Sequence, residues 1–269
     1  MRNTLWGHFN MNLNIKGKYA LVTGGSHGIG LAIARALAEE GCNVAICARN
    51  QERISRTLTE LQKIGVQAIG VQADVLQPSS IESVIKAIIY NWGTLHILVN
   101  NVGGGGRWGT DSIEDTPEQV WVDVYNKNAM AAVRFVRLVI PFMRKQKWGR
   151  VVTIASMYGR EGGGRPWFNM SKSAEISLMK TLAMNPVLAR SGITFNTVAP
   201  GNIMIPDTGW DEEMKKDLRG FKRIISTLPL GRLGTAEEVA NMVVFLCSEK
   251  ASLVNGACIA VDGGESHSF

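Results

Sequence analysis

The stretch that most constrains the fold is Thr23-Gly24-Gly25-Ser26-His27-Gly28-Ile29-Gly30, near the amino terminus. It follows a short apolar run, Tyr19–Val22, and opens a segment with helical periodicity, Ile29–Glu39. Glycines between a strand and a helix leave backbone N–H groups free to approach a phosphate, and the helix dipole favours negative charge there. The stretch therefore predicts a dinucleotide-binding turn. The residues assigned to it are Gly24, Ser26, His27, Gly28, Ile29 and Gly30.

Strand and helix patterns alternate along the rest of the chain. Apolar runs typical of buried strands recur at residues 43–48, 68–71, 97–99, 151–155, 193–198 and 259–261. Helical periodicity lies between them, at 51–64, 80–90, 117–144, 169–190 and 236–248. Repeated βα units predict one doubly wound, Rossmann-like α/β domain, with a parallel sheet of about seven strands and helices on both faces. The domain is expected to span 11–269, after an extension at 1–10.

Composition narrows the classes of partner. The 269 residues are 45% hydrophobic, and 29 basic against 23 acidic side chains give a net charge of +6. The basic residues are scattered apart from a run at 144–150, so we expect no nucleic-acid binding. The four cysteines form no Cys-x-x-Cys pair, and no metal site is predicted. Since neither a membrane-spanning run nor a signal-peptide pattern is present, we expect a cytoplasmic protein without membrane contact.

The end of the second predicted strand bears on the choice between NAD and NADP. An acidic residue there binds the ribose 2′-hydroxyl and repels a 2′-phosphate. This chain has Ala48-Arg49-Asn50, and the guanidinium of Arg49 suits a phosphate. NADP(H) is therefore the expected cofactor, with NAD(H) as the second choice. The alternative is that Arg49 faces solvent or stacks on adenine.

A second segment, Arg165-Pro-Trp-Phe-Asn-Met-Ser-Lys172, places an aromatic residue one helical turn before a lysine. It lies shortly after Ser156. With five further motifs it resembles the classical branch of the short-chain dehydrogenase/reductase family, in the family's order and over residues 15–264. Those motifs are the first glycine stretch, Asn100-Asn101-Val102-Gly103, Ser156-Met-Tyr-Gly159, Pro200-Gly201 and Val261-Asp262-Gly263-Gly264. The family signature in the second segment is Tyr-x-x-x-Lys, whereas this chain has Phe168-x-x-x-Lys172.

The resemblance implies NAD(P)-dependent interconversion of a carbonyl and a secondary alcohol. Its catalytic positions fall on Asn128, Ser156, Phe168 and Lys172. By resemblance Ser156 binds the substrate oxygen, Lys172 binds the nicotinamide ribose, and Asn128 holds a water. Further cofactor contacts are implied at Asp74, Val75, Asn101, Val102, Gly103, Lys172, Pro200, Gly201 and Ile203.

Phenylalanine keeps the ring of the family tyrosine but cannot exchange a proton. Because general acid–base catalysis contributes roughly 10²–10⁴ in rate, we expect low activity. One hypothesis is an engineered substitution in an otherwise active enzyme, which the retention of Asn128, Ser156 and Lys172 favours. The other is a native, non-catalytic chain that binds a nucleotide as a scaffold or sensor. Tyr158 carries another hydroxyl, but it lacks the one-turn relation to Lys172.

Three arginines close to these motifs bear on the substrate. Arg107, Arg160 and Arg165 lie next to glycines and predict an anionic substrate, such as a sugar acid, a nucleotide-linked sugar or an acyl thioester. Solvent-facing loop charge is the alternative. By resemblance, residues 203–230 form a lid over the substrate, and the chain assembles as a homotetramer or homodimer.

Overall fold

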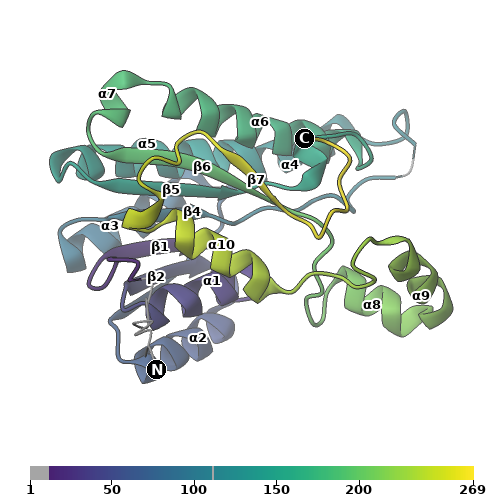
Figure 1. Ribbon diagram of the computed structural model, residues 1–269, viewed down its shortest axis with the longest axis horizontal. Coiled ribbons are helices and arrows are strands. Elements are labelled where there is room, and N and C mark those ends of the chain that lie inside the picture. The colour runs from purple at the N-terminus through teal and green to yellow at the C-terminus, as the bar shows by residue number, and fades with distance from the viewer. Residues whose placement is uncertain (1–11, 111) are drawn as a thin grey trace, which may run out of the picture.

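A seven-stranded sheet, in the order β3-β2-β1-β4-β5-β6-β7, organises the computed structural model (Figure 1). The structure describes residues 12–110 and 112–269, so the extension expected at 1–10 lies outside the described residues. The strands are β1 (Tyr19–Thr23), β2 (Asn43–Ala48), β3 (Ala68–Gln72), β4 (Ile97–Asn100), β5 (Gly149–Ile154), β6 (Ile193–Pro200) and β7 (Cys258–Val261). Every neighbouring pair is parallel. The predicted doubly wound parallel sheet is confirmed.

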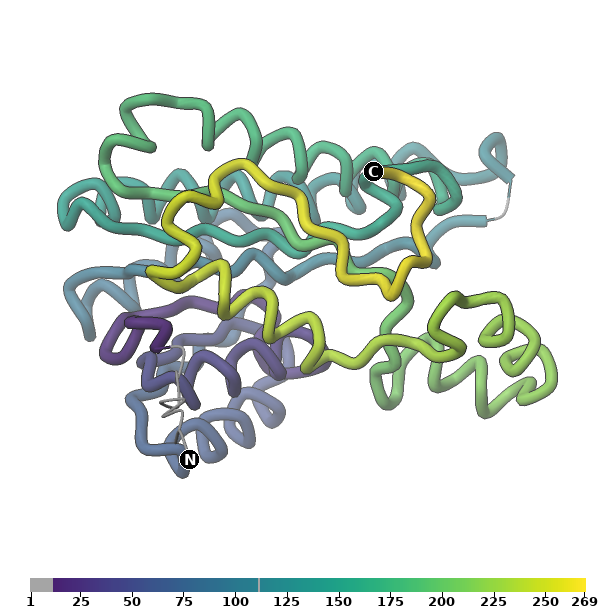
Figure 2. The backbone as a smooth tube through the Cα atoms, viewed as in Figure 1, coloured from purple at the N-terminus to yellow at the C-terminus, as the bar shows by residue number. Residues whose placement is uncertain are grey.

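Helices cover both faces of this sheet (Figures 1 and 2). They are α1 (Gly28–Glu39), α2 (Gln51–Ile64), α3 (Pro78–Trp92), α4 (Glu118–Tyr125), α5 (Ala131–Lys145), α6 (Pro166–Ala183), α7 (Pro186–Ala189), α8 (Gly209–Lys216), α9 (Leu218–Thr227) and α10 (Ala236–Leu246). Shorter turns are the π-helical η1 (Asn126–Met130) and the 3₁₀ turns η2 (Met157–Gly159) and η3 (Glu249–Ala251).

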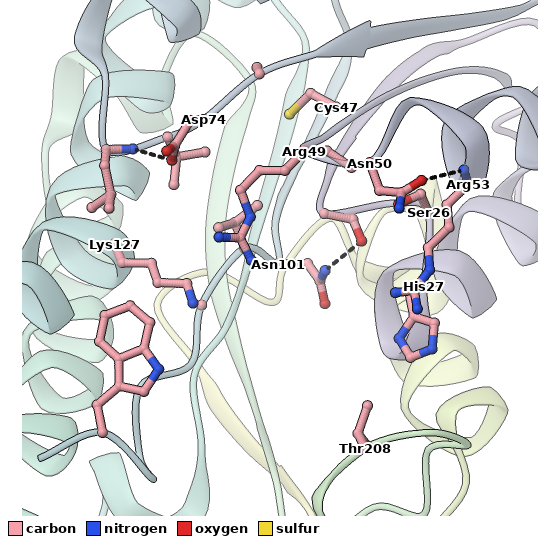
Figure 3. Close-up of a pocket in the computed structure, with 18 residues that line it drawn as sticks. Ser26, His27, Cys47, Arg49, Asn50, Arg53, Asp74, Asn101, Lys127 and Thr208 are labelled. Atoms are coloured by element: carbon pink, nitrogen blue, oxygen red, sulfur yellow. Dashed lines mark hydrogen bonds between the residues drawn. The ribbon is translucent and has the colours of Figure 1, made fainter.

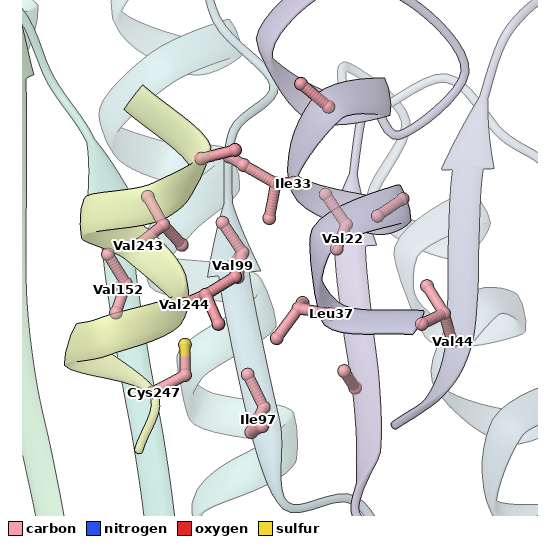
Figure 4. Close-up of a cluster of buried hydrophobic side chains, with 14 of the residues drawn as sticks. Val22, Ile33, Leu37, Val44, Ile97, Val99, Val152, Val243, Val244 and Cys247 are labelled. Atoms are coloured by element: carbon pink, nitrogen blue, oxygen red, sulfur yellow. The ribbon is translucent and has the colours of Figure 1, made fainter. Parts of the chain in front are cut away.

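Successive side chains of each strand point to opposite faces of the sheet, so the core has two layers. Val22 is in register with Val99, and Val99 with Val152. These side chains share one face, where they pack with residues of α1 and α10 (Figure 4). Residues one position earlier on each strand point to the opposite face and pack with α3, α5 and α6. Burial on both faces explains why the strands read as continuous apolar runs.

Two long helices expected from periodicity are interrupted. The pattern at 117–144 is divided by η1, whose π-helical turn buries Asn128. The pattern at 169–190 is divided at Asn185, whose side-chain oxygen accepts hydrogen bonds from the backbone N–H groups of Val187 and Leu188. Pro186 then begins α7, since proline suits the first helical position. At both places polar contacts, and at the second also a proline, interrupt the single helix that the apolar periodicity predicts.

The carboxyl ends of the parallel strands meet at one edge of the sheet, where ligands bind in folds of this type. The loops after β1, β4, β5 and β6 leave from this edge. Residues 203–230 follow β6 and contain α8 and α9, which project past that edge (Figure 2). Of the residues in α9, none is buried.

Candidate functional site

The turn after β1 allows close approach of backbone to a ligand. Gly24 and Gly28 have φ of +66° and +55°, a region that favours glycine. A Cβ at Gly30 would lie 2.3 Å from the Gly24 carbonyl oxygen and 2.4 Å from the Asn101 amide nitrogen. Helix α1 begins at Gly28, and the preceding residue, His27, makes no capping contact through its side chain. The first N–H groups of α1 are therefore available to an anion.

The loop after β4 is tied to this turn. The backbone N–H groups of Asn101 and Val102 donate to the Thr23 hydroxyl oxygen, at 2.9 and 3.0 Å. The Asn101 side-chain amide donates to the Thr23 carbonyl oxygen at 2.9 Å. These bonds hold the two loops side by side and leave Gly103 at the edge of the space between them.

A cavity of about 480 Å³ opens between these loops and the end of β2 (Figure 3). Of the sequence-predicted cofactor residues, those that line it are Gly24, Ser26, His27, Arg49, Asp74, Val75, Asn101, Val102 and Gly103. Among the remaining predicted residues, Gly28, Ile29 and Gly30 form the start of α1, while Pro200, Gly201, Ile203 and Lys172 belong to neighbouring segments. The cavity wall also includes Thr208, from the segment after β6.

Positive charge dominates the cavity wall. Arg49, Arg53 and Lys127 line it, against the single carboxylate of Asp74 (Figure 3). Burial and the neighbouring Arg53 lower the pKa of His27. Burial and the charge of Arg49 lower the pKa of Lys127. Burial is the larger cause of both shifts, and the neighbouring arginine charges add to it. The cationic side chains that line the cavity make it suitable for an anion.

Sequence reasoning missed Arg53 and Lys127. Arg53 lies in the first turn of α2, whose start is set by the Asn50 side chain accepting a hydrogen bond from the Arg53 N–H at 2.8 Å. A signal was available, because first-turn residues of helices that follow strands lie at the ligand-binding edge. Lys127 carries no such signal. Its ammonium lies 4.5 Å from the Trp108 ring centroid, a contact that only the fold creates.

Asn128 and Lys172 meet beside Gly103. A Cβ at Gly103 would lie 2.6 Å from the Asn128 side-chain oxygen and 2.9 Å from Lys172 Nζ. Asn128 donates to the carbonyl oxygens of Gly104 and Val124 and accepts from the Gly104 N–H. Its amide therefore fixes the glycine-rich loop after β4, which contains Gly103 and Gly104, against η1.

Lys172 has a buried partner that was not anticipated. Its Nζ donates to Glu175 Oε2 at 2.9 Å and to the Ile154 carbonyl oxygen at 3.0 Å. Burial raises the pKa of Glu175, and the Lys172 charge opposes that rise. An apolar residue is the usual expectation at a buried helix position, so the sequence alone did not single out Glu175.

Ser156 and Phe168 lie on neighbouring elements. Ser156 follows β5, and its side-chain oxygen accepts the Tyr158 N–H at 3.2 Å. Phe168 lies in the first turn of α6, with its ring centroid 5.7 Å from Lys172 Nζ. A Cβ at Gly106 would lie 3.4 Å from the ring, so the loop after β4 packs directly on Phe168. Helix α6 packs in turn on η2.

The three arginines contact different segments. Arg165 donates to the carbonyl oxygens of Trp108 and Thr110. Arg160 donates to the carbonyl oxygen of Ser268, near the carboxyl terminus. Arg107 packs on Gly209 at the start of α8, where a Cβ would meet its guanidinium at 2.6 Å. The guanidinium groups of Arg160 and Arg165 thus donate hydrogen bonds to main-chain carbonyl oxygens, whereas Arg107 lies against the start of α8.

Residues 12–110 and 112–269 are the part of the chain that the structure describes. No cluster of His, Cys, Asp and Glu side chains in this part of the chain could hold a metal ion. No helix there is long and apolar enough to cross a membrane.

Comparison with known proteins gives the family. The family model described as Enoyl-(Acyl carrier protein) reductase matches residues 24–266. The chain belongs to the short-chain dehydrogenase/reductase family. It is 36% identical over 253 residues to 3-oxoacyl-[acyl-carrier-protein] reductase FabG of Escherichia coli (strain K12), covering 94% of this chain and 98% of the relative.

Solved structures of family members superimpose on most of the chain. L-sorbose reductase from Gluconobacter frateurii, solved with NADPH and L-sorbose, has a TM-score of 0.88 and 32% identity, covering 96% of this chain and 100% of that chain. A variant of actinorhodin polyketide ketoreductase, solved with NADPH, has a TM-score of 0.85 and 35% identity, covering 93% of this chain and 98% of that chain. Family membership makes the protein an NAD(P)-dependent oxidoreductase by descent.

Proposed function

We propose that the protein binds NADP(H) in preference to NAD(H) and belongs to the reductases that convert a carbonyl to a secondary alcohol. The observation that carries this proposal is the cationic cavity at the ends of β1, β2 and β4. Arg49, Arg53 and His27 surround the place where NAD-binding members of such folds carry a carboxylate. Two of the similar structures are complexes with NADPH, which supports the same cofactor.

The chain's own residues fit a dinucleotide. The glycine turn and the uncapped start of α1 suit the pyrophosphate, and Arg49 and Arg53 suit the 2′-phosphate. Lys172 Nζ lies next to Gly103, which lines the cavity, and would hold the nicotinamide ribose. When bound, the nicotinamide supplies or accepts a hydride.

Ser156 and Asn128 have separate tasks in this proposal. The Ser156 oxygen already accepts the Tyr158 N–H, so its own hydroxyl hydrogen remains free to donate to a substrate carbonyl oxygen. Asn128 holds the glycine-rich loop in place and keeps Gly103 next to Lys172. Reduction also needs a proton at the carbonyl oxygen, and Phe168 cannot provide one.

We infer slow turnover from Phe168, which stands where the family carries its proton-donating tyrosine. Loss of a general acid costs roughly 10²–10⁴ in rate. A native scaffold or sensor is the second candidate function. The observation behind it is Phe168 itself, which removes the proton donor while the dinucleotide cavity remains complete. Cofactor binding without turnover on a broad carbonyl panel would support that candidate.

For the substrate we propose an anionic carbonyl compound, with a 3-oxoacyl thioester first among the candidates. The named activities of the relative from Escherichia coli and of the polyketide ketoreductase support this class. Arg107, beside α8, is the arginine available for an anionic group, and residues 203–230 would form the lid over it. A panel of charged and neutral carbonyl compounds tests the class. Preference for neutral sugars or steroids would reject it.

Assembly as a homodimer or homotetramer is part of the proposal. An apolar groove of about 610 Å³ lies on the outer side of α4 and α6, lined by Trp121, Val122 and Met170 among others. Val122 and Met170 are exposed in the single chain. A second copy would cover them. A monomer mass from light scattering at micromolar concentration would refute this assembly.

NADPH titration of the purified protein, followed by fluorescence, is the first experiment. We expect saturable binding that is tighter for NADPH than for NADH. Absence of binding to either nucleotide would reject the proposed function as a whole.

A further inference from the structure

The pair formed by Lys172 and Glu175 is almost completely removed from solvent. The side chains are 4% and 1% exposed, and Nζ lies 2.9 Å from Oε2. An isolated charge in such a position is strongly unfavourable, whereas a paired and hydrogen-bonded one is tolerated. Lys172 and Glu175 can therefore be charged in this position only as a pair.

Two hydrogen bonds fix the direction of the Lys172 ammonium. An ammonium has three N–H donors, and two are used by Glu175 and by the Ile154 carbonyl oxygen. On another side Nζ lies next to Gly103, which lines the cofactor cavity. Because two donors are held from within the fold, the third is left for a ligand in the cavity.

Phe168 gives Lys172 no hydrogen bond. Its ring stands 5.7 Å from Nζ, at a distance where the ring face offers only a weak attraction. In the described part of the chain, Glu175 is the one side chain that forms a hydrogen bond with Lys172. Orientation of the ammonium therefore depends on Glu175 and on one main-chain carbonyl.

We propose that Glu175 is a positioning residue, whose carboxylate keeps Lys172 charged and directed at the bound dinucleotide. This inference rests on the proposed function, because it takes the cavity as the NADP(H) site. It assigns a role in cofactor binding to a residue that touches neither cofactor nor substrate. It also explains how a site without a phenol keeps its lysine in place.

Other charged groups near the pair are few. Helix η1 brings Lys127, whose pKa is lowered in part by the Lys172 charge. The η2 turn brings Tyr158, and burial raises the pKa of its hydroxyl. Helix α4 carries the exposed Glu118 and the half-buried Asp123. Strand β6 and helix α7 contain no charged residue, and Arg150 of β5 pairs with Glu249 instead. Among residues 12–110 and 112–269, Glu175 alone forms an ion pair with Lys172.

The test compares NADPH dissociation constants of the full-length protein and its variants between about pH 6 and pH 9. In Glu175→Gln the buried ammonium loses its counter-charge, and an uncompensated buried charge is strongly unfavourable. We expect the affinity relative to the parent to be nearly unchanged at low pH and to fall by about 10- to 100-fold at high pH. Lys172→Met should bind NADPH more weakly than the parent at every pH, because it carries no ammonium at any pH. Glu39→Gln, an exposed change of the same kind, is the matched control.

The outcomes separate the two proposals. If the parent does not bind NADPH, the proposed function fails first. If the parent binds and Glu175→Gln follows the control at every pH, the positioning role is rejected. Because a buried unpaired lysine endangers folding, the double variant Lys172→Met/Glu175→Leu provides a second test, since it leaves no buried charge. It should bind NADPH as Lys172→Met does, and a further loss of more than about threefold would show that Glu175 acts independently of Lys172.

Discussion

Replacement of Phe168 by tyrosine is the most direct test of the chemistry. The change adds one hydroxyl at ring atom Cζ. A Cβ at Gly106 would meet the ring at Cγ and the two Cδ atoms, at the opposite end, so Gly106 does not oppose the added hydroxyl. Phe168→Tyr should therefore fold as the parent does and place a proton donor near Ser156 and Lys172.

The magnitude follows from the role of a general acid. A gain of roughly 10²–10⁴ in turnover corresponds to about 2.7–5.4 kcal/mol of barrier. Lys172 lies 5.7 Å from the ring centroid, and its charge lowers the pKa of a nearby phenol. Glu175 shares that charge at 2.9 Å, which weakens the effect. We therefore expect the lower part of the range, about 10².

The assay is the rate of NADPH oxidation with 3-oxoacyl thioesters and with simple ketones. Cofactor affinity should change little, so the gain should appear in turnover. Phe142→Tyr, which adds the same hydroxyl on α5 away from the site, is the matched control. Ordinary enzyme rates in the unchanged protein would refute the reasoning and direct attention to Tyr158. If Phe168→Tyr gains nothing although NADPH binds, the scaffold function is favoured.

Three further predictions concern specificity and stability. Arg49→Asp should shift the ratio of NADPH to NADH affinity towards NADH, and an unchanged ratio would remove Arg49 from the 2′-phosphate site. Asn128→Ala should lower the free energy of unfolding by about 1–3 kcal/mol in urea titrations, because the half-buried Gly104 N–H and the buried Val124 carbonyl oxygen lose a partner. An unchanged midpoint would contradict this. Burial lowers the pKa of His96 from 6.5 to about 4, so the unfolded chain binds more protons in this interval. The free energy of unfolding should thus fall as pH drops from about 6.5 to about 4 and then level off, and His96→Asn, which keeps an acceptor for the Tyr19 N–H, should reduce that dependence.

Local chemistry explains why much of the fold was predictable. A strand buried on both faces is mostly apolar, and the turn after β1 has no room for a Cβ at Gly30. Both requirements can be recognised directly in the sequence. The one-turn spacing of Phe168 and Lys172 likewise places both on one side of a helix. These features depend on neighbours within a few residues, and the parallel order of the sheet follows from the alternation of strands and helices.

Contacts between segments that are distant along the chain could not be predicted from the sequence. Arg53 and Lys127 join the cavity because α2 and η1 converge at one edge of the sheet, and Arg160 finds its partner at Ser268, far along the chain. Periodicity also missed η1, where polar contacts of a buried amide outweigh the apolar repeat. The sequence by itself determined a parallel α/β sheet with a dinucleotide turn and a lysine lacking its usual phenol. Only the tertiary structure decided that this lysine is paired with Glu175, because the energy of a buried charge depends on what the fold places around it.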